Sequence, residues 1–240
     1  MKNWMIALSA CIMMLVSVNV FAQDTAAKCS CNALSGAEQK LGFKQLFDGT
    51  KLCPKIWQGS IDGYPVDTTT GTFSCQKGGQ LMTIEEYDNF VFRFEFKLPP
   101  KGNNGVGIRT KLGVNPAYDG MEIQILGDDY VGAKDWQKHG SIYGVVPAKT
   151  GALKPNGQWN TEEIVALGTK IKVTVNGQVI VDTDIANAAP VDGHKHPGLL
   201  NKSGVVGFLG HNDPVVFRNV RIKKIVCEEC LKKIADAEKK

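Results

Sequence analysis

The side chains best suited to chemistry stand on segments in which apolar and polar residues alternate. In residues 121–126, Glu122 and Gln124 alternate with apolar residues. Successive side chains of a β-strand point to opposite faces, so Glu122 and Gln124 are predicted to share the face turned away from the core. The same count places Arg109 on the outer face of its strand. An acid, an amide and a guanidinium in a groove suit a sugar, which is held through its hydroxyl groups. The alternative is a solvated cross-strand pair of Glu122 and Arg109, which contributes little to stability.

Aromatic and amide side chains are candidates for completing such a site. Trp159, Tyr143 or Trp136 could stack on a sugar ring. Asn104 lies in the sequence Asn-Asn-Gly, which is a turn first and a sugar-binding loop second. No serine or cysteine nucleophile motif appears, and no phosphate-binding glycine loop follows a strand.

Two of the four histidines are candidates for a general base. His139 begins a glycine-containing turn and could lie near Glu122, and His211 follows the end of an expected strand. An imidazole titrates near neutral pH, which suits a base. A hydrogen-bonded structural histidine is the alternative for each. His194 and His196 could ligate a metal on an extended loop, but two ligands do not make a site.

The segments that must position these residues are predominantly β. Residues 90–97 alternate phenylalanine with other residues, which is typical of a half-buried strand. Asn176-Gly177 joins two alternating runs and predicts a hairpin. Helical patterning is confined to 35–40 and 227–240. Many short strands separated by turn signals predict an all-β, two-sheet jelly-roll sandwich of the concanavalin or lectin type, with short terminal helices.

Composition narrows the class of protein. The chain has 240 residues, of which 43% are hydrophobic and 22% charged, and this balance excludes a disordered or collagen-like chain. Its net charge is +4, without a clustered basic stripe before the last few residues. We therefore expect no nucleic-acid partner.

The N-terminus predicts export to the periplasm or the extracellular space. Lys2 precedes an apolar run that ends in a small residue, so residues 1–22 read as a signal peptide, with a membrane anchor as the alternative. No later stretch approaches the roughly 20 apolar residues of a membrane span, and no membrane insertion of the mature chain is expected. The remaining divisions are an N-terminal extension at 23–42, a β-sandwich domain at 43–226 and a short helical tail at 227–240.

Six cysteines remain after the signal peptide, and an even number in an oxidising compartment favours disulfides. Cys29 and Cys31 lie near one end and Cys227 and Cys230 near the other, while Cys53 and Cys75 flank one early segment. We expect the first strand to lie beside the last, which would bring the terminal cysteines within reach of one another. A zinc site made by those four thiolates is the alternative.

A series of motifs resembles the 3-keto-disaccharide hydrolase domain family, a concanavalin-like sandwich of exported bacterial proteins. The resemblance covers roughly residues 43–225, and the segment 129–138 looks particular to this chain. The motifs that carry it, in order, are Leu46-Phe47-Asp48-Gly49-Thr50 with Trp57, Gly79 to Thr83, Tyr87 to Phe90 with Glu95-Phe96-Lys97, Gly102 to Arg109, Glu122 to Ile125 with Asp128, His139 to Gly144, Trp159-Asn160 with Val175-Asn176-Gly177, and Phe217 to Ile222.

The resemblance implies a hydrolase or lyase that acts on glycosidic bonds of 3-keto sugars. A ketone at C3 acidifies the C2 proton, so a base can remove it, an enolate can form, and the group at C1 can leave before water adds. Glu122 or His139 is the expected base. Arg109, Lys154 or a divalent metal is the expected partner of the enolate oxygen, which must be stabilised as it forms. The identity of any cofactor is left open.

Two alternatives remain from the residues alone. A conventional glycoside hydrolase would use an acid pair such as Glu122 and Asp128. A lectin-like carbohydrate-binding module would bind a sugar without turnover, because sandwich folds host both enzymes and binders. In each case the expected partner is a small carbohydrate.

Overall fold

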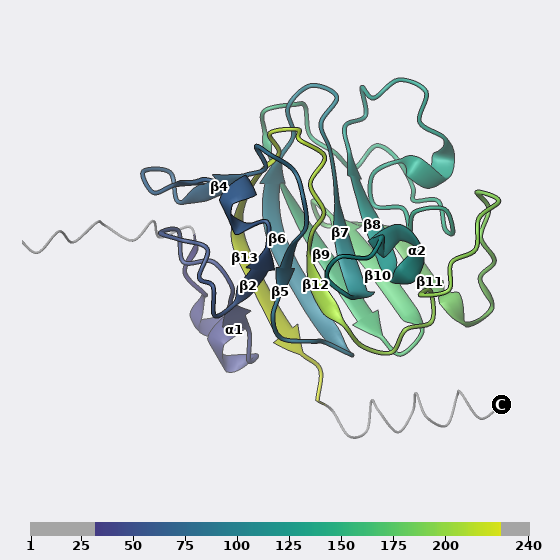
Figure 1. Cartoon of the computed structure of the whole chain (residues 1–240), viewed down its shortest axis with the longest axis horizontal. Helices are drawn as coiled ribbons and strands as arrows, with labels where there is room; N and C mark the ends of the chain where they lie inside the picture. The colour runs from purple at the N-terminus through teal and green to yellow at the C-terminus, as the bar shows by residue number, and fades with distance from the viewer. Residues whose placement is uncertain (1–31, 227–240) are drawn as a thin grey trace, which may run out of the picture.

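The computed structural model describes residues 32–226 and shows two antiparallel sheets packed face to face (Figure 1). The prediction of a two-sheet jelly-roll sandwich is confirmed. The larger sheet has the order β11 (Gln178–Asp184), β10 (Lys170–Val175), β9 (Trp159–Leu167), β6 (Phe90–Lys97), β13 (Val216–Lys224), β4 (Thr72–Ser74) and β3 (Val66–Asp67), with β1 (Lys44–Gln45) also paired to β13. The smaller sheet has the order β2 (Trp57–Gly59), β5 (Leu81–Thr83), β12 (Val205–Phe208), β7 (Asn103–Thr110) and β8 (Met121–Leu126).

Helices of the described residues are short, with at most five residues each. They are α1 (Gly36–Lys40), α2 (Pro116–Asp119) and the 3-10 turns η2 (Ile61–Gly63), η3 (Asp135–Gln137) and η4 (Ile185–Asn187). α1 begins at a capping box in which Ser35 and Glu38 bond each other's backbone. Among residues 32–226, no helix has the length and apolarity required to cross a membrane.

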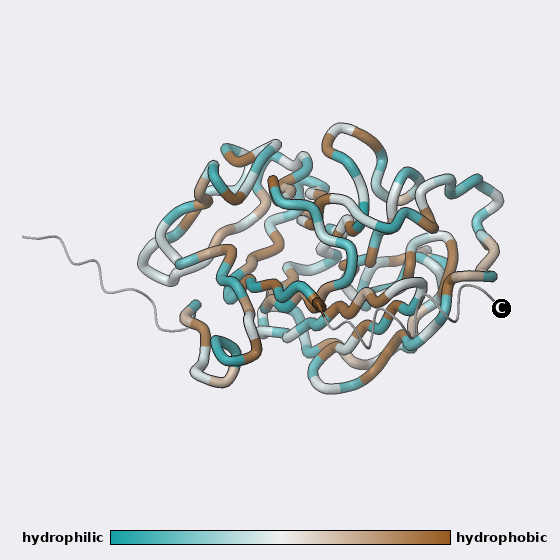
Figure 2. The backbone as a smooth tube through the Cα atoms, turned by 90° about the horizontal axis from the view of Figure 1, so that it is seen from below, coloured by the Kyte–Doolittle hydropathy of each residue, from teal (hydrophilic) through white to brown (hydrophobic). Residues whose placement is uncertain are grey.

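The core between the sheets is rich in phenylalanine. The four phenylalanines of β6 are fully buried and alternate with partly exposed residues, as their period of two predicts. Phe94 meets Phe208 of the smaller sheet with ring centroids 5.4 Å apart, and Phe208 lies 4.1 Å from Phe217. Figure 2 shows hydrophobic and hydrophilic residues alternating along the strands. This interlocked layer fixes the two sheets relative to each other.

Two predicted connections are confirmed. Asn176 and Gly177 both have positive φ angles, 50° and 80°, and join β10 to β11 in a tight hairpin. Lys44 of β1 pairs with Ile222 of β13, so the first and last strands are neighbours.

The structure describes two of the six cysteines that the sequence led us to expect in disulfides. Cys53 and Cys75 are both free thiols, and Cys75 is buried in the core beside Tyr64. The predicted signal peptide, the helical tail and the bridge between the terminal cysteines all lie outside the described residues.

Candidate active site

The floor of the candidate site is the pair of strands β7 and β8. Met121, Ile123 and Ile125 enter the core, and Glu122 and Gln124 share the opposite face. The facing positions on β7 are glycines: Gly107 pairs with Glu122, and Gly105 pairs with Gln124. A Cβ atom at Gly105 would collide with Oε1 of Glu122. Gly105 therefore leaves the space that the Glu122 side chain occupies.

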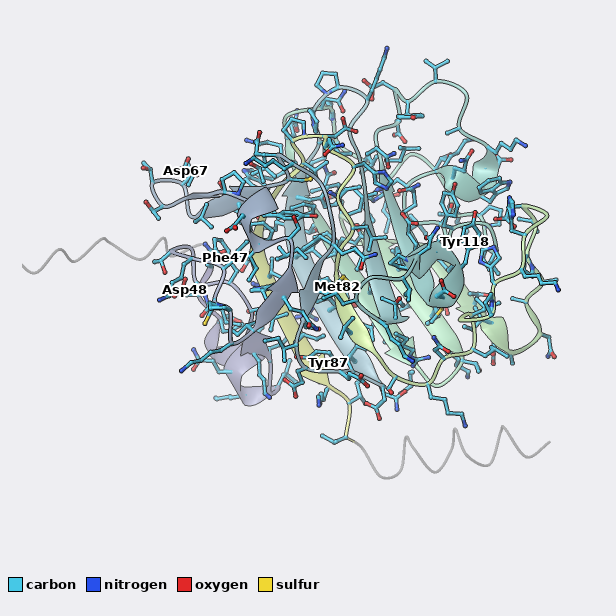
Figure 3. The ribbon with its side chains drawn as sticks, viewed as in Figure 1. Phe47, Asp48, Asp67, Met82, Tyr87 and Tyr118 are labelled. Atoms are coloured by element: carbon cyan, nitrogen blue, oxygen red, sulfur yellow. The ribbon has the colours of Figure 1, made fainter. Side chains whose placement is uncertain are left out.

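A pocket of about 340 Å³ opens above this floor. Tyr118 of α2 forms one wall, and α2 packs on β7 and β8 (Figure 3). The remaining lining consists of Asn103, Asn115, Ala117, Leu126, the loop residues Tyr130, Val131, Gly132, Ala133 and Gln137, and Tyr143 and His211. No lysine or arginine is among the described residues that line it. A ligand in this pocket meets neutral hydrogen-bonding groups and one carboxyl group.

That carboxyl group, on Glu122, is buried without a partner. Glu122 is 7% exposed, and within residues 32–226 no hydrogen bond or ion pair reaches its carboxylate oxygens. Burial raises the pKa of Glu122 to about 8. A carboxyl group in a cleft with its pKa raised by desolvation is a functional-site candidate, because it is a stronger base than an exposed carboxylate.

Two amide oxygens of the pocket lining also lack partners. Oε1 of Gln124 and Oδ1 of Asn103 are buried, and no group of the described chain donates a hydrogen bond to them. Both residues line the pocket. Buried polar atoms are normally hydrogen-bonded, so these two acceptors suit hydroxyl donors of a bound molecule.

The segment after the pocket loop runs alongside β8. The Tyr143 N–H donates to the carbonyl oxygen of Glu122 at 2.9 Å, which places Tyr143 in the pocket wall. Its hydroxyl accepts from Nε2 of Gln137 at 3.2 Å, and the Trp136 ring meets the Tyr143 ring edge-on with centroids 5.1 Å apart. Trp136 thus supports Tyr143 from behind and does not line the pocket.

His211 stands at the rim of the same pocket. Partial desolvation lowers the pKa of its imidazole, and the charge of Asp213 opposes that shift. A neutral imidazole at the rim can accept or donate a hydrogen bond. The structure thus gathers Glu122, Gln124, Tyr143 and His211, four of the residues that the sequence singled out.

His139 lies on the other side of β8, away from Glu122. Its ring stacks on Phe96 with centroids 5.2 Å apart, and its Nδ1 accepts from the N–H of Leu126 at 3.4 Å. Its Nε2 is 3.5 Å from the Oε2 atom of the buried Glu162. Burial lowers the pKa of His139 to about 3. The expected closeness of His139 and Glu122 is not present, because the imidazole turns into the core.

Arg109 is not in the Glu122 pocket either. It is buried and has a positive φ of 49°. Its guanidinium donates to the carbonyl oxygens of Asp88 at 2.9 Å and Gly168 at 2.7 Å. Burial lowers the pKa of Arg109. Arg109 lines a separate pocket of about 490 Å³ and ties β7 to two turns.

Three further predicted ligand residues lie outside the pocket. Nζ of Lys154 donates to the carbonyl oxygen of Trp159 at 3.0 Å. The indole of Trp159 is covered by the Arg218 guanidinium, 4.0 Å from the ring centre. Asn104 points to the core side of β7, where its Oδ1 accepts from the N–H groups of Gly105 and Gly210.

The part of the chain that the structure describes offers no donor set for a metal. It contains no group of three or more His, Cys, Asp or Glu side chains placed to share an ion. Of the two histidines considered as ligands, His196 is bound to Asp192 at 3.1 Å. The divalent metal considered from the sequence therefore enters no step below.

The sequence of this chain is similar to a known protein family. The family model described as the 3-keto-alpha-glucoside-1,2-lyase-like domain matches residues 42–223. The chain belongs to this family. A curated relative, the 3-keto-disaccharide hydrolase of Bacteroides thetaiotaomicron, is 25% identical, and the match covers 61% of this chain. This chain spans only 62% of the length of that relative.

Solved structures agree on the fold of this lyase-like family member. A crystal structure from Parabacteroides distasonis ATCC 8503, provisionally assigned as a glycosyl hydrolase, has a TM-score of 0.71 and 23% identity, and covers 81% of this chain and 99% of its own. A second from the same organism, with the same provisional assignment, has a TM-score of 0.62 and 25% identity, and covers 76% of this chain and 99% of its own.

Sequence reasoning missed several pocket residues of this lyase-like domain, Tyr118 above all. The signal was present in Asn115-Pro116, because Asn is a favoured helix N-cap and Pro a favoured first residue. Asn115 does cap α2, accepting from the N–H of Ala117. The helix that carries Tyr118 has only four residues, too few to show a helical period in the sequence.

Proposed function

We propose that the protein is an exported enzyme that cleaves the glycosidic bond of 3-keto glycosides by abstraction of the C2 proton. The observation that carries the proposal is the buried, unpartnered carboxyl group of Glu122 in a pocket lined by neutral polar groups. Membership of the lyase-like family supports the substrate class.

The reaction begins with the C2–H bond, which the neighbouring C3 ketone acidifies. The ionised Glu122 carboxylate takes the proton, and the bonding electrons form a C2–C3 double bond with an enolate on the C3 oxygen. The enolate then reforms the ketone and expels the C1 oxygen with its bonding pair, which leaves a C1–C2 double bond. Water adds a hydroxyl group to C1 and a proton to C2, so the net result is hydrolysis.

Neutral donors replace the cation that the sequence led us to expect. The lining contributed by the described residues has no lysine or arginine. Gln124 and Tyr143 line the pocket, and their amide N–H and hydroxyl groups can donate to an enolate oxygen. Fixed donors in a poorly solvated site stabilise developing charge strongly.

The raised pKa of Glu122 suits a base. A base is most effective when its pKa lies near the working pH, because both its basicity and its ionised fraction are then substantial. A pKa of about 8 meets that condition.

A conventional glycosidase is disfavoured by the distribution of acids. Glu122 is the one acidic residue among the described residues that line its pocket. Asp128, the other member of the acid pair considered from the sequence, lines a neighbouring pocket of about 360 Å³ with His139. A carboxyl pair across one glycosidic bond is the requirement of that mechanism.

The test compares a 3-keto disaccharide with its unoxidised parent in deuterated water. The wild type should cleave the glycosidic bond of the 3-keto disaccharide only, and it should place deuterium at C2 of the product. Glu122→Gln should lower turnover by about 10²–10⁴-fold. Glu86→Gln, which removes an exposed carboxylate elsewhere, is the matched control and should leave turnover unchanged.

Each other outcome contradicts the proposal in a distinct way. Cleavage of both sugars indicates a conventional glycosidase. Binding of either sugar without cleavage indicates a lectin-like module. Cleavage of the ketone without deuterium at C2 excludes proton abstraction at that carbon.

A further inference from the structure

A buried aspartate–histidine pair lies behind the pocket, outside the groups used above. Oδ2 of Asp192 is 3.1 Å from Nε2 of His196, and their side chains are 0% and 1% exposed. Oδ1 of Asp192 accepts from the N–H of His194 at 2.9 Å. Burial raises the pKa of Asp192, but the hydrogen bonds from His194 and His196, with the charges of those histidines, outweigh it and lower the pKa overall. The aspartate is ionised and fixed in one orientation.

The pair is packed against Tyr118. The His196 ring meets the Tyr118 ring edge-on, with centroids 4.9 Å apart and an interplanar angle of 66°. The N–H of Gly198, two residues beyond His196, donates to the carbonyl oxygen of Tyr118 at 2.8 Å. Side-chain and backbone contacts therefore hold Tyr118 from the same short segment.

The same pair also packs against Gly144, the residue that follows Tyr143 in the pocket wall. A Cβ atom at Gly144 would collide with Oδ2 of Asp192 and lie 2.8 Å from Cε1 of His196. Gly144 has a φ of 71° and follows Tyr143 directly. Its carbonyl oxygen accepts from the N–H of Val191 at 2.7 Å. Only a glycine fits here, so the close approach of the pair to the pocket wall is built into the backbone.

Tyr118 has a hydroxyl that is free to act on a ligand. Within residues 32–226 no hydrogen bond engages it, whereas the Tyr143 hydroxyl accepts a hydrogen bond from Gln137 and has its own proton assigned above to the enolate oxygen. Burial raises the pKa of Tyr118, and the charges of Tyr143, Asp192 and Glu122 raise it further. The hydroxyl is thus protonated at neutral pH and serves as a donor.

We propose that Tyr118 is the catalytic proton donor to the departing C1 oxygen, and that Asp192 and His196 are the positioning pair that holds it. The inference rests on the proposed function. As the enolate collapses, the C1–O bond breaks and its electron pair goes to the leaving oxygen, which takes the proton of the Tyr118 hydroxyl. The tyrosinate recovers a proton from solvent. Glu122 and Tyr118 then divide the chemistry, one taking the C2 proton and the other releasing the aglycone.

The first test varies the leaving group. Tyr118→Phe keeps the ring that contacts His196 and removes only the hydroxyl. On a methyl 3-keto glucoside, whose alkoxide needs a proton to leave, turnover should fall by about 10²–10⁴-fold. On the 4-nitrophenyl 3-keto glucoside, whose phenolate leaves unaided, turnover should change by less than about threefold by the same reasoning. Tyr118→Phe should still exchange the C2 proton of both glucosides with deuterated water.

The matched control for the lost hydroxyl is Tyr87→Phe. The Tyr87 hydroxyl donates to Glu85 at 3.0 Å and lies outside the pocket lining. This variant should match the wild type on both glucosides, which shows that loss of a tyrosine hydroxyl does not by itself change turnover.

The second test addresses the positioning pair. Asp192→Ala should slow cleavage of the methyl glucoside by up to about 100-fold, since small misplacements of a catalytic group carry costs of that size. Asp192→Asn keeps the size and one acceptor oxygen and should recover part of the rate. In the Tyr118→Phe background, Asp192→Ala should have no further effect on the rate. The Tyr118 hydroxyl that Asp192 helps to position is already absent, so the two effects should not add. If the pair were purely structural, Asp192→Ala would slow cleavage of both glucosides, and its effect would add to that of Tyr118→Phe.

Failure of this inference is distinguishable from failure of the proposed function. Equal losses on the two glucosides, or wild-type rates in Tyr118→Phe, overturn the role of Tyr118 while C2 exchange by the wild type still supports Glu122. Cleavage by the wild type without C2 exchange overturns both. Thermal unfolding of each variant identifies losses that come from misfolding, and Asp192→Asn stands in if Asp192→Ala does not fold.

Discussion

The buried carboxyl group of Glu122 should make the stability of the protein depend on pH in a way that Glu122→Gln removes. Folding places this group in a pocket where no hydrogen bond or ion pair from the described residues compensates its charge. The unfolded chain exposes the same group to water. The pKa therefore differs between the two states, and the difference is a contribution to the free energy of unfolding.

The magnitude follows from the two pKa values. The ordinary value is 4.5 and the folded value is about 8. Between these pH values the folded state holds a proton that the unfolded state has lost, so the free energy of unfolding falls as pH rises. At about 1.4 kcal/mol per pH unit, the loss is about 3 kcal/mol by pH 7 and about 5 kcal/mol above pH 8. Below pH 4.5 both states are protonated and Glu122 contributes no such penalty.

The assay is urea denaturation of the wild type and Glu122→Gln between pH 4 and 9. Subtracting one curve from the other cancels the remaining titrating groups. The two proteins should be similar near pH 4, and the variant should be the more stable one at pH 7 and above. Glu86→Gln, at an exposed position, should follow the wild type throughout. In parallel, kcat/KM of the wild type should rise with pH and level off above about 8, as the base ionises.

Parallel stability curves for the wild type and Glu122→Gln would refute the reasoning, because they would show that the folded pKa is ordinary. A variant that is less stable at every pH would show that the carboxylate makes a stabilising contact.

Three other substitutions test the arrangement around this group. Gly105→Ala should displace the Glu122 side chain and lower turnover by about 100-fold with the fold retained, as circular dichroism and steady-state rates would show. Phe94→Ala should lower the free energy of unfolding by about 3–5 kcal/mol in urea titrations, because it opens a cavity between the sheets. His139→Ala should lower stability by about 2–4 kcal/mol yet leave kcat/KM within a few-fold, and a loss of more than 100-fold in a folded variant would return His139 to the chemistry.

The sequence predicts the strands, and it predicts which side chains of β8 face the pocket. Both follow from the local alternation of apolar and polar residues. Glu122 and Gln124 lie two residues apart on one strand, so a period of two places them together whatever surrounds them. The phenylalanines of β6 follow the same rule.

Other site residues escape that rule because their positions depend on irregular or distant structure. Arg109 has a positive φ, and the pairing of β12 with β7 shifts register near it, so counting alternate residues fails there. His139 lies in a turn, where the side of the sheet that a ring faces is set by Phe96 and Glu162, residues far away in the sequence. Trp159 was a candidate for stacking on a sugar ring, but Arg218 from another strand covers its ring.

The floor and the outer wall of the Glu122 pocket come from different kinds of structure, and this difference bears on how the protein can diversify. The floor is the strand pair β7 and β8, in which nearly every residue is buried. A Cβ atom at Gly105 or Gly107 would also collide with a neighbouring side chain. The wall from Tyr130 to Ala133 is a loop with an exposed tip at Val131, and a Cβ atom added at the next residue, Gly132, would meet nothing within 4 Å. Loops of this kind tolerate substitution and insertion. A gene lineage, or a library randomised at 130–133, can therefore exchange this part of the pocket lining while Glu122 and Gln124 on β8 stay fixed.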